Sequence, residues 1–156
     1  MSEALPIWDF TFLAEDEVAS FDLNATTKFD DYGYILEVDL KYPEHLHDSQ
    51  SDYPLAAEKL SITNEMLSAY SSFLISKHVT SEQLSPNRYD KTNYVVHCEN
   101  LRLYLKHGLQ LVKVHSSSKF RQSAWIKPYV DYNTAKRRAA KSSFLQSHYK
   151  NLNNML

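Results

Sequence analysis

The residues with the clearest chemistry in this sequence are basic side chains close to its end. They are Lys136, Arg137, Arg138, Lys141 and Lys150. Asp131 is the only acidic residue in the stretch 122–156, so little negative charge offsets them. The same stretch lacks glycine, so local propensity favours helix while local charge favours an anionic partner. The pattern therefore predicts phosphate binding.

A bend must bring these basic residues together. On one unbroken helix Arg138 and Lys150 would lie about 18 Å apart along the axis, too far for both to hold one small polyphosphate. Ser142 and Ser143 are the predicted break, because serine competes for backbone hydrogen bonds and prefers helix caps to helix interiors. We expect an antiparallel helical hairpin in which Arg138 and Lys141 face Lys150 and flank one anion.

The end of the chain resembles the fingers motif of family B DNA polymerases. That motif has a lysine, an Asn-Ser pair four residues later and then an aromatic-Gly pair. Here Lys150 and Asn154 take the first two places, and Met155 replaces the serine. In the family, the lysine and basic residues of the preceding helix contact the triphosphate of the incoming nucleotide. The resemblance therefore implies nucleotide binding by Lys150, Asn154, Arg137, Arg138 and Lys141.

A second part of the chain is similar to the protein-primed branch of that family, which includes viral, organellar and Polinton-like transposon polymerases. The run GYILEVDLKYP, followed by HLHD and DYPLA, carries this similarity within residues 33–56. Met1-Ser2 and Leu5-Pro6 resemble the end of the first palm motif, whose catalytic aspartate would then lie upstream of residue 1. The resemblance implies a fragment between the first palm motif and the fingers motif.

Charge is distributed unevenly along the 156 residues. Residues 1–60 hold 14 acidic and 3 basic side chains, whereas residues 101–156 hold 11 basic and 1 acidic. Either the C-terminal part meets phosphate, or the two halves neutralise one another in the fold. The expected organisation is an insertion or palm-adjacent α+β region at 1–118 and a truncated fingers hairpin at 119–156. DNA binding is expected at Lys113, Lys119, Arg121 and Lys127.

The expected fold class is α+β. Alternation is clearest in residues 34–42, where Leu36, Val38, Leu40 and Tyr42 share one face. Other strands are expected at residues 5–13, 94–97 and 109–115, helices at 54–80 and 99–107, and a loop at 81–93. In the first strand Trp8, Phe10 and Phe12 should share a face, and Gly108 should end the second helix.

The sequence offers little for metal binding or covalent catalysis. His45, His47, Asp48 and Asp52 have metal-ligand spacing but are predicted to form a surface loop. Asp39 stands three residues before Tyr42, whereas the family's catalytic aspartate stands about five before its tyrosine, so Asp39 is not assigned to metal. Cys98 is assigned to packing, because adjacent residues on a strand, such as His97 and Cys98, point apart.

The resemblance implies a fragment of a DNA-directed DNA polymerase that binds DNA and the phosphates of a deoxynucleoside triphosphate. A priming terminal protein is a further expected partner. Magnesium is expected in the parent polymerase and not on this chain, which lacks the paired carboxylate motifs and should not polymerise alone. The alternatives are a non-catalytic DNA- or phosphate-binding module, or a decayed mobile-element product without activity. An intracellular location is expected, in nucleus or cytoplasm, because no secretion signal or membrane span is found.

Overall fold

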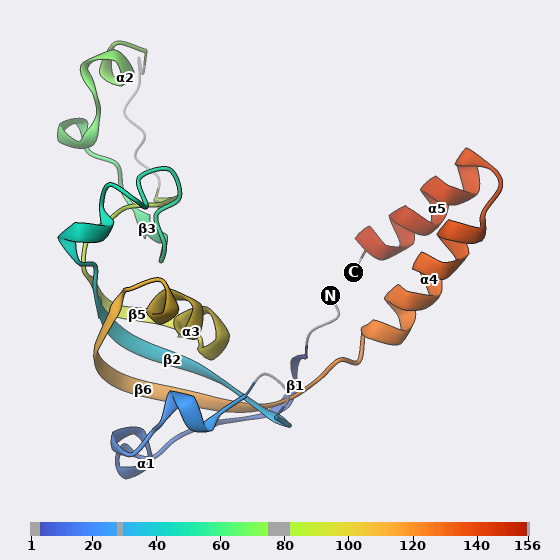
Figure 1. Cartoon of the computed structure of the whole chain (residues 1–156), viewed down its shortest axis with the longest axis horizontal. Coiled ribbons are helices and arrows are strands. Elements are labelled where there is room, and N and C mark those ends of the chain that lie inside the picture. The colour runs from blue at the N-terminus through green and yellow to red at the C-terminus, as the bar shows by residue number, and fades with distance from the viewer. Residues whose placement is uncertain (1–3, 28–29, 75–81, 156) are drawn as a thin grey trace. The chain divides into compact units, whose positions relative to one another are not determined.

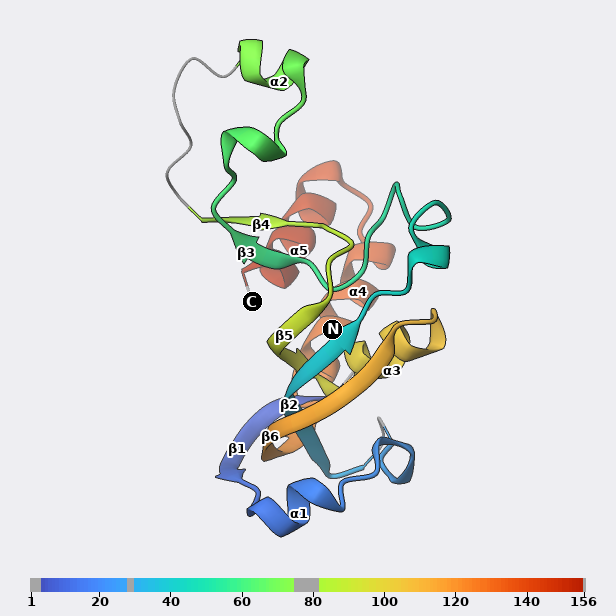
Figure 2. The same ribbon diagram turned by 90° about the vertical axis from the view of Figure 1, so that its left-hand side faces the viewer.

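The computed structural model describes residues 4–27, 30–74 and 82–155, and within them the chain has the expected α+β fold (Figure 1). Its strands and α-helices are β1 (Leu5–Phe12), α1 (Glu15–Ala19), β2 (Tyr32–Lys41), β3 (Glu58–Leu60), α2 (Ala69–Leu74), β4 (Gln83–Ser85), β5 (Lys91–His97), α3 (Cys98–Lys106), β6 (Gln110–Ser123), α4 (Lys127–Ala139) and α5 (Ser143–Asn154). Short 3₁₀ helices lie at Leu23–Ala25, Glu44–Leu46 and Asn64–Met66. One sheet has the strand order β1-β6-β2-β5, and β3 and β4 form a separate antiparallel ribbon (Figure 2).

β2 confirms the alternation predicted for residues 34–42. Leu36, Val38 and Leu40 are each at most 1% exposed, and Tyr42, just beyond the strand, is also buried. Full burial of an aliphatic side chain of this size contributes about 1.5–3 kcal/mol, so this one face supplies much of the core. The opposite face remains partly exposed.

By the density of its internal contacts the chain divides into two compact units. Unit 1 comprises residues 1–36, 97–99 and 116–156. Its buried side chains include Leu23, Cys98 and Phe120. Gly33 lies against the Phe120 ring, where a Cβ atom would come within 2.4 Å of a ring carbon, so a side chain at this position would displace the core aromatic.

Unit 2 comprises residues 37–96 and 100–115. Val96, Leu101 and Leu109 are among its buried side chains. Gly108 follows α3 with φ of 99°, a left-handed conformation that glycine adopts without strain, and thus confirms the predicted C-cap.

The helix expected over residues 54–80 and the loop expected over 81–93 are wrong in part. β3 and β4 fall inside these ranges and pair with each other, with Glu58 opposite Ser85 and Leu60 opposite Gln83. The apolar spacing that suggested a long helix is realised only in α2, and residues 75–80 of the expected helix lie outside the described residues. A ribbon whose strands are separated by more than twenty residues leaves no short-range signal in either strand.

β1 departs from the simple alternation that its sequence predicted. Trp8 pairs with Arg121 and Thr11 with Lys119, so three steps along β1 correspond to two along β6. This extra residue is a β-bulge, and Asp9 within it has φ of 61°. A second register shift lies between Pro6 and Trp8, where two steps along β1 correspond to one along β6. Trp8 therefore shares a face with Arg121. The Phe10 ring instead packs against buried Phe120, with 5.7 Å between the two ring centroids. The expectation that Trp8 and Phe10 share a face is wrong.

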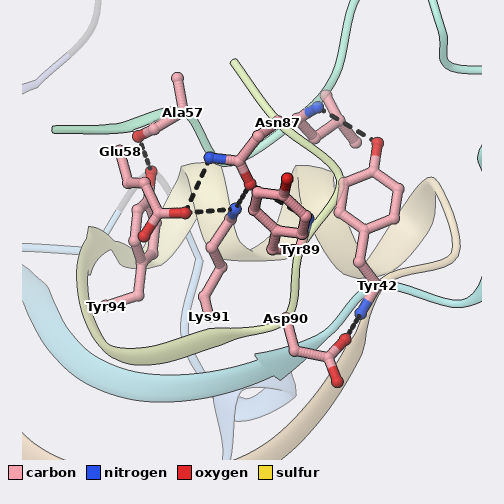
Figure 3. A network of polar contacts seen from close by, with 9 residues as sticks. Tyr42, Ala57, Glu58, Asn87, Tyr89, Asp90, Lys91 and Tyr94 are labelled. Carbon is pink, nitrogen blue, oxygen red and sulfur yellow. Dashed lines mark hydrogen bonds and ion pairs between the residues drawn. The ribbon is translucent and has the colours of Figure 1, made fainter. Parts of the chain in front are cut away.

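A polar network in unit 2 joins the β3–β4 ribbon to β5 (Figure 3). The Lys91 ammonium, on a residue only 2% exposed, donates to Glu58 Oε1 at 2.8 Å and also to Asn87 Oδ1. The Asn87 side-chain amide donates to the same Glu58 oxygen at 2.8 Å, and Tyr94 Oη donates to the Ala57 carbonyl at 3.0 Å. The buried lysine is thus bonded to partners from β3 and from the segment before β5.

His97 makes the start of α3 sensitive to pH. Its Nδ1 accepts the Glu99 backbone N–H at 3.2 Å, as a helix cap does. Burial lowers the pKa of His97 below its ordinary value of 6.5, against the opposing influence of the Glu99 carboxylate. The unfolded chain therefore binds the proton more readily than the folded one, and stability falls as pH drops below about 6.5.

We expect the His97→Asn variant to lose this pH dependence. Asparagine keeps an acceptor oxygen for the cap but does not titrate, so the free energy of unfolding at pH 7 should change by no more than about 1 kcal/mol. Urea denaturation between pH 7 and pH 5 tests this. A variant whose stability falls as steeply with acid as that of the unsubstituted chain would rule out His97 as the source.

Candidate phosphate-binding site

α4 carries most of the predicted phosphate-binding residues. It begins with Lys127 and Pro128, where proline is favoured because the first turn needs no N–H partner, and Lys127 pairs with Asp131 one turn on. Its last turn is basic and contains Lys136, Arg137 and Arg138. Cations near a helix C-terminus are stabilised by the helix dipole, so part of this pattern serves the helix itself.

The predicted break between the two helices is confirmed at Ser142. The Ser142 side chain caps α5 by accepting the Leu145 backbone N–H at 3.3 Å. The Gln146 side-chain amide donates to the Ala140 carbonyl at 3.0 Å and so ties the first turn of α5 to the end of α4. These bonds satisfy backbone groups that a tight helical turn would leave without partners.

An asparagine pair sets the register of the antiparallel hairpin, in which α4 and α5 lie side by side (Figure 1). Asn133 is 2% exposed, and its Nδ2 donates to Asn153 Oδ1 at 2.9 Å. Asn153 Nδ2 in turn lies 3.4 Å from Thr134 Oγ1. Because Asn133 lies opposite Asn153 and Ala140 opposite Gln146, Lys150 is level with Lys136.

This register corrects one detail of the predicted site. Lys141 lies at the closed end of the hairpin, so Lys150 does not face it. The eight residues between Ser142 and Lys150 place the lysine about 12 Å along α5 from that end. A break at Ser142 keeps Lys141 at the closed end, because Lys141 precedes Ser142 by a single residue.

A pocket of about 390 Å³ opens between the two helices near Arg138. It is lined by Thr134, Arg137 and Arg138 from α4 and by Gln146 from α5. The described residues that line it include no acid. Two guanidinium groups, one hydroxyl and one amide form a donor-rich set that matches the oxygens of a phosphate.

The structure brings together some of the predicted nucleotide-binding residues. Arg137 and Arg138 line the pocket, whereas Lys141, Lys150 and Asn154 do not. Lys150 follows Gln146 by four residues, which places it on the same face of α5 about 6 Å further along. A phosphate chain longer than the pocket would therefore extend toward Lys150.

Sequence reasoning missed Thr134 and Gln146. Thr134 precedes Arg137 and Arg138 by three and four residues, so helical spacing alone places it on their face and could have identified it. Gln146 joins the pocket through the register between two helices, for which the sequence carries no short-range signal.

The predicted DNA-binding residues separate into different environments. Lys119 and Arg121 lie together beside the Tyr32 ring, with Lys119 Nζ 4.1 Å from its centroid. Lys127 is paired with Asp131 on exposed α4. Lys113 belongs to unit 2 and is close enough to Asp39 to help lower the pKa of that carboxyl, after hydrogen bonds from the Asn93 N–H and from His115.

A second pocket, of about 560 Å³, lies in unit 2 around the predicted histidine cluster. Its lining includes His45, His47 and Tyr89. The charged residues around it are of both signs, namely Lys41, Arg88, Glu44 and Asp90. Arg88 donates to the His47 carbonyl at 2.6 Å, and Asp90 accepts the Tyr42 N–H at 2.7 Å. Because this lining is electrically balanced, the hairpin pocket is the stronger candidate for an anion.

Other expectations for catalytic groups can be placed in the structure. The Asp39 Oδ1 atom lies 2.8 Å from His115 Nε2, and Cys98 is buried. His97 and Cys98 do not point apart as expected, because α3 begins at Cys98 and leaves its Sγ 3.9 Å from His97 Nδ1. Within the described ranges, no three His, Cys, Asp or Glu side chains gather in a way that could hold a metal ion.

None of the helices in the described part of the chain has the length and apolar character needed to cross a membrane. No protein-family model, no curated protein and no solved structure was found to match the sequence or the fold. The functional assignment therefore depends on the chain's own residues and on their geometry.

Proposed function

We propose that this chain is the connecting insertion and fingers segment of a family B DNA polymerase of the protein-primed branch. In this role it binds the phosphates of an incoming deoxynucleoside triphosphate and contacts DNA, and it is not catalytic by itself. A priming terminal protein is a further proposed partner, and the proposed setting is intracellular, in nucleus or cytoplasm. Metal-dependent phosphoryl transfer is assigned to carboxylates outside this chain.

One observation carries the proposal. The two helices of the hairpin place Arg137, Arg138, Thr134 and Gln146 around one pocket, whose lining includes no acid among the described residues, with Lys150 one turn further along α5. A triphosphate seated at the guanidinium groups would have Lys150 within reach of its outer phosphates. This arrangement supports the roles that the fingers motif implies, in which Lys150 and basic residues of the preceding helix contact one triphosphate.

A non-catalytic phosphate-binding module is the second candidate, and the pocket itself favours it. Its lining omits Lys150 and Asn154, the two residues that carry the motif resemblance. A module of this kind would bind any polyanion through Arg137 and Arg138. Its binding to DNA would depend steeply on salt and would show no preference for nucleotides.

Titration of the purified chain with a fluorescent deoxynucleoside triphosphate separates these candidates. The polymerase proposal predicts that a triphosphate binds more tightly than inorganic phosphate or the nucleoside, and that excess inorganic triphosphate competes with it. Equal competition by heparin and by triphosphate at matched charge would favour the general module. Absence of binding by a folded chain would contradict both.

A further inference from the structure

A cluster of aromatic and basic side chains lies on one face of the sheet in unit 1. We call it the cation–aromatic surface and define it by Trp8 on β1, Tyr32 on β2, and Lys119 and Arg121 on β6. Arg121 Cζ lies 5.8 Å from the Trp8 ring centroid and 5.3 Å from that of Tyr32. Lys119 Nζ lies 4.1 Å from the Tyr32 centroid. Two cations and two rings thus alternate across three neighbouring strands.

The β-bulge between Trp8 and Thr11 determines which face of the sheet Trp8 occupies. Without the extra residue, the pairing of Thr11 with Lys119 would place Trp8 on the opposite face, with Phe120. The bulge instead turns Trp8 toward Arg121, while Phe10 packs on Phe120. Bulges of this kind re-aim a single side chain, and here the side chain is a tryptophan directed away from the core.

Trp8 is unusually open for its type. It is 58% exposed, although tryptophan side chains are highly buried on average. One ring face lies toward Arg121, and the high exposure leaves much of the ring accessible to a ligand. An exposed aromatic ring beside two cations is the combination that stacks a base and holds its phosphates.

We propose that the cation–aromatic surface binds single-stranded nucleic acid, with one base stacked on Trp8 and flanking phosphates on Lys119 and Arg121. The inference rests on the DNA partner proposed above but uses residues separate from the hairpin pocket. Bases in a duplex are already stacked on their neighbours and cannot offer a free face to Trp8, so single strands are the favoured form. Stacking of one base on an aromatic side chain changes affinity about 5- to 150-fold.

The charges around the surface limit its attraction for polyanions in general. Asp9 and Asp31 interact electrostatically with Arg121 and offset part of its charge. At most two phosphates are neutralised by Lys119 and Arg121, so the logarithm of the affinity should fall with that of the salt concentration by a slope no steeper than about −1.4. Stacking rather than charge therefore dominates, which distinguishes this surface from the basic hairpin.

The two tryptophans of the chain provide a matched test, because Trp125 is 57% exposed and is not part of the surface. The first measurement is binding of a fluorescein-labelled oligothymidylate to the full chain. We expect Trp8→Ala to weaken binding about 5- to 150-fold, whereas Trp8→Phe, which keeps an aromatic ring, should retain much of the affinity. Trp125→Ala should bind like the unsubstituted chain.

The second measurement uses intrinsic fluorescence and does not require an alanine variant to fold. In Trp125→Phe the only tryptophan is Trp8, and oligothymidylate should quench it; in Trp8→Phe the remaining Trp125 should respond little. Equal responses of both tryptophans, or displacement of oligothymidylate equally well by a duplex, would overturn the inference.

Triphosphate binding by the hairpin and oligothymidylate binding by the cation–aromatic surface can be tested separately. Triphosphate binding without oligothymidylate binding overturns the surface alone, and loss of both overturns the proposed function as well. Retention of triphosphate binding by Trp8→Ala, together with weakened oligothymidylate binding, supports two separate sites.

Discussion

Replacing Glu58 with glutamine is expected to lower the free energy of unfolding by about 3 kcal/mol, because it leaves the Lys91 ammonium buried without a counter-charge. The Lys91 side chain is only 1% exposed, and Glu58 is its carboxylate partner at 2.8 Å. Loss of one member of a buried pair costs about 3–5 kcal/mol, and the 27% exposure of the Glu58 side chain argues for the lower end. Urea denaturation at pH 7 measures the change.

Replacing Lys91 as well supplies a control for this prediction. In Glu58→Gln with Lys91→Met no charge is left buried, so most of the lost stability should return. Asp131→Asn removes an exposed pair, Lys127–Asp131, whose partners lie one helical turn apart, and should cost only about 0.3–0.5 kcal/mol. A Glu58→Gln variant as stable as Asp131→Asn would show that the network of Figure 3 does not hold the β3–β4 ribbon in place.

The same carboxylate should contribute to acid sensitivity. Burial raises the pKa of Glu58, but hydrogen bonds from Lys91 and Asn87 outweigh it and leave the pKa below its ordinary 4.5. The folded chain therefore holds the proton less readily than the unfolded chain, and this contribution to stability is present above about pH 4.5 and lost as pH falls below it. The stability of Glu58→Gln should accordingly depend less steeply on pH in that acidic range.

Replacing Arg138 and Lys150 together with alanine should have the largest effect on ligand binding. Each loses a charge-assisted hydrogen bond to phosphate, which contributes about 1.5–3 kcal/mol, so each single variant should weaken triphosphate binding at least about 10-fold. Both side chains are exposed, which favours the lower end of this range. The double variant should lose at least about 100-fold.

A double-mutant cycle shows whether both residues act on one ligand. If Arg138 and Lys150 bind the same triphosphate, the binding free energy lost in the double variant should differ from the sum of the losses in the two single variants by more than about 0.5 kcal/mol. Lys136→Ala is the matched control, because Lys136 does not line the pocket and its Nζ lies 5.5 Å from the Tyr132 ring centroid. Equal losses in Lys136→Ala and Arg138→Ala would mean that general charge, and not the pocket, determines binding.

Features with a local cause were predictable from the sequence. The face of β2 that carries Leu36, Val38 and Leu40 follows from alternation within one strand. The hairpin follows from helical propensity on either side of Ser142, a residue that caps helices well. The basic side of the candidate site was equally visible, because Arg137 and Arg138 are neighbours in one helix.

Features that depend on distant pairing were not predictable. The β3–β4 ribbon joins Glu58 to Ser85, and the bulge that exposes Trp8 is defined only by its register against β6. Likewise, Gln146 reaches the pocket through the Asn133–Asn153 contact between helices. In each case the deciding interaction connects residues whose own neighbours in the sequence give no indication of it.

Triphosphate binding in the hairpin pocket can be tested by NMR mapping of backbone amide shifts during titration with a deoxynucleoside triphosphate. We expect the largest saturable shifts at Thr134, Arg137, Arg138, Gln146 and Lys150, with little change around Trp8 or around the balanced pocket near Arg88. Shifts centred on residues outside the hairpin, or none from a folded chain at millimolar nucleotide, would contradict it.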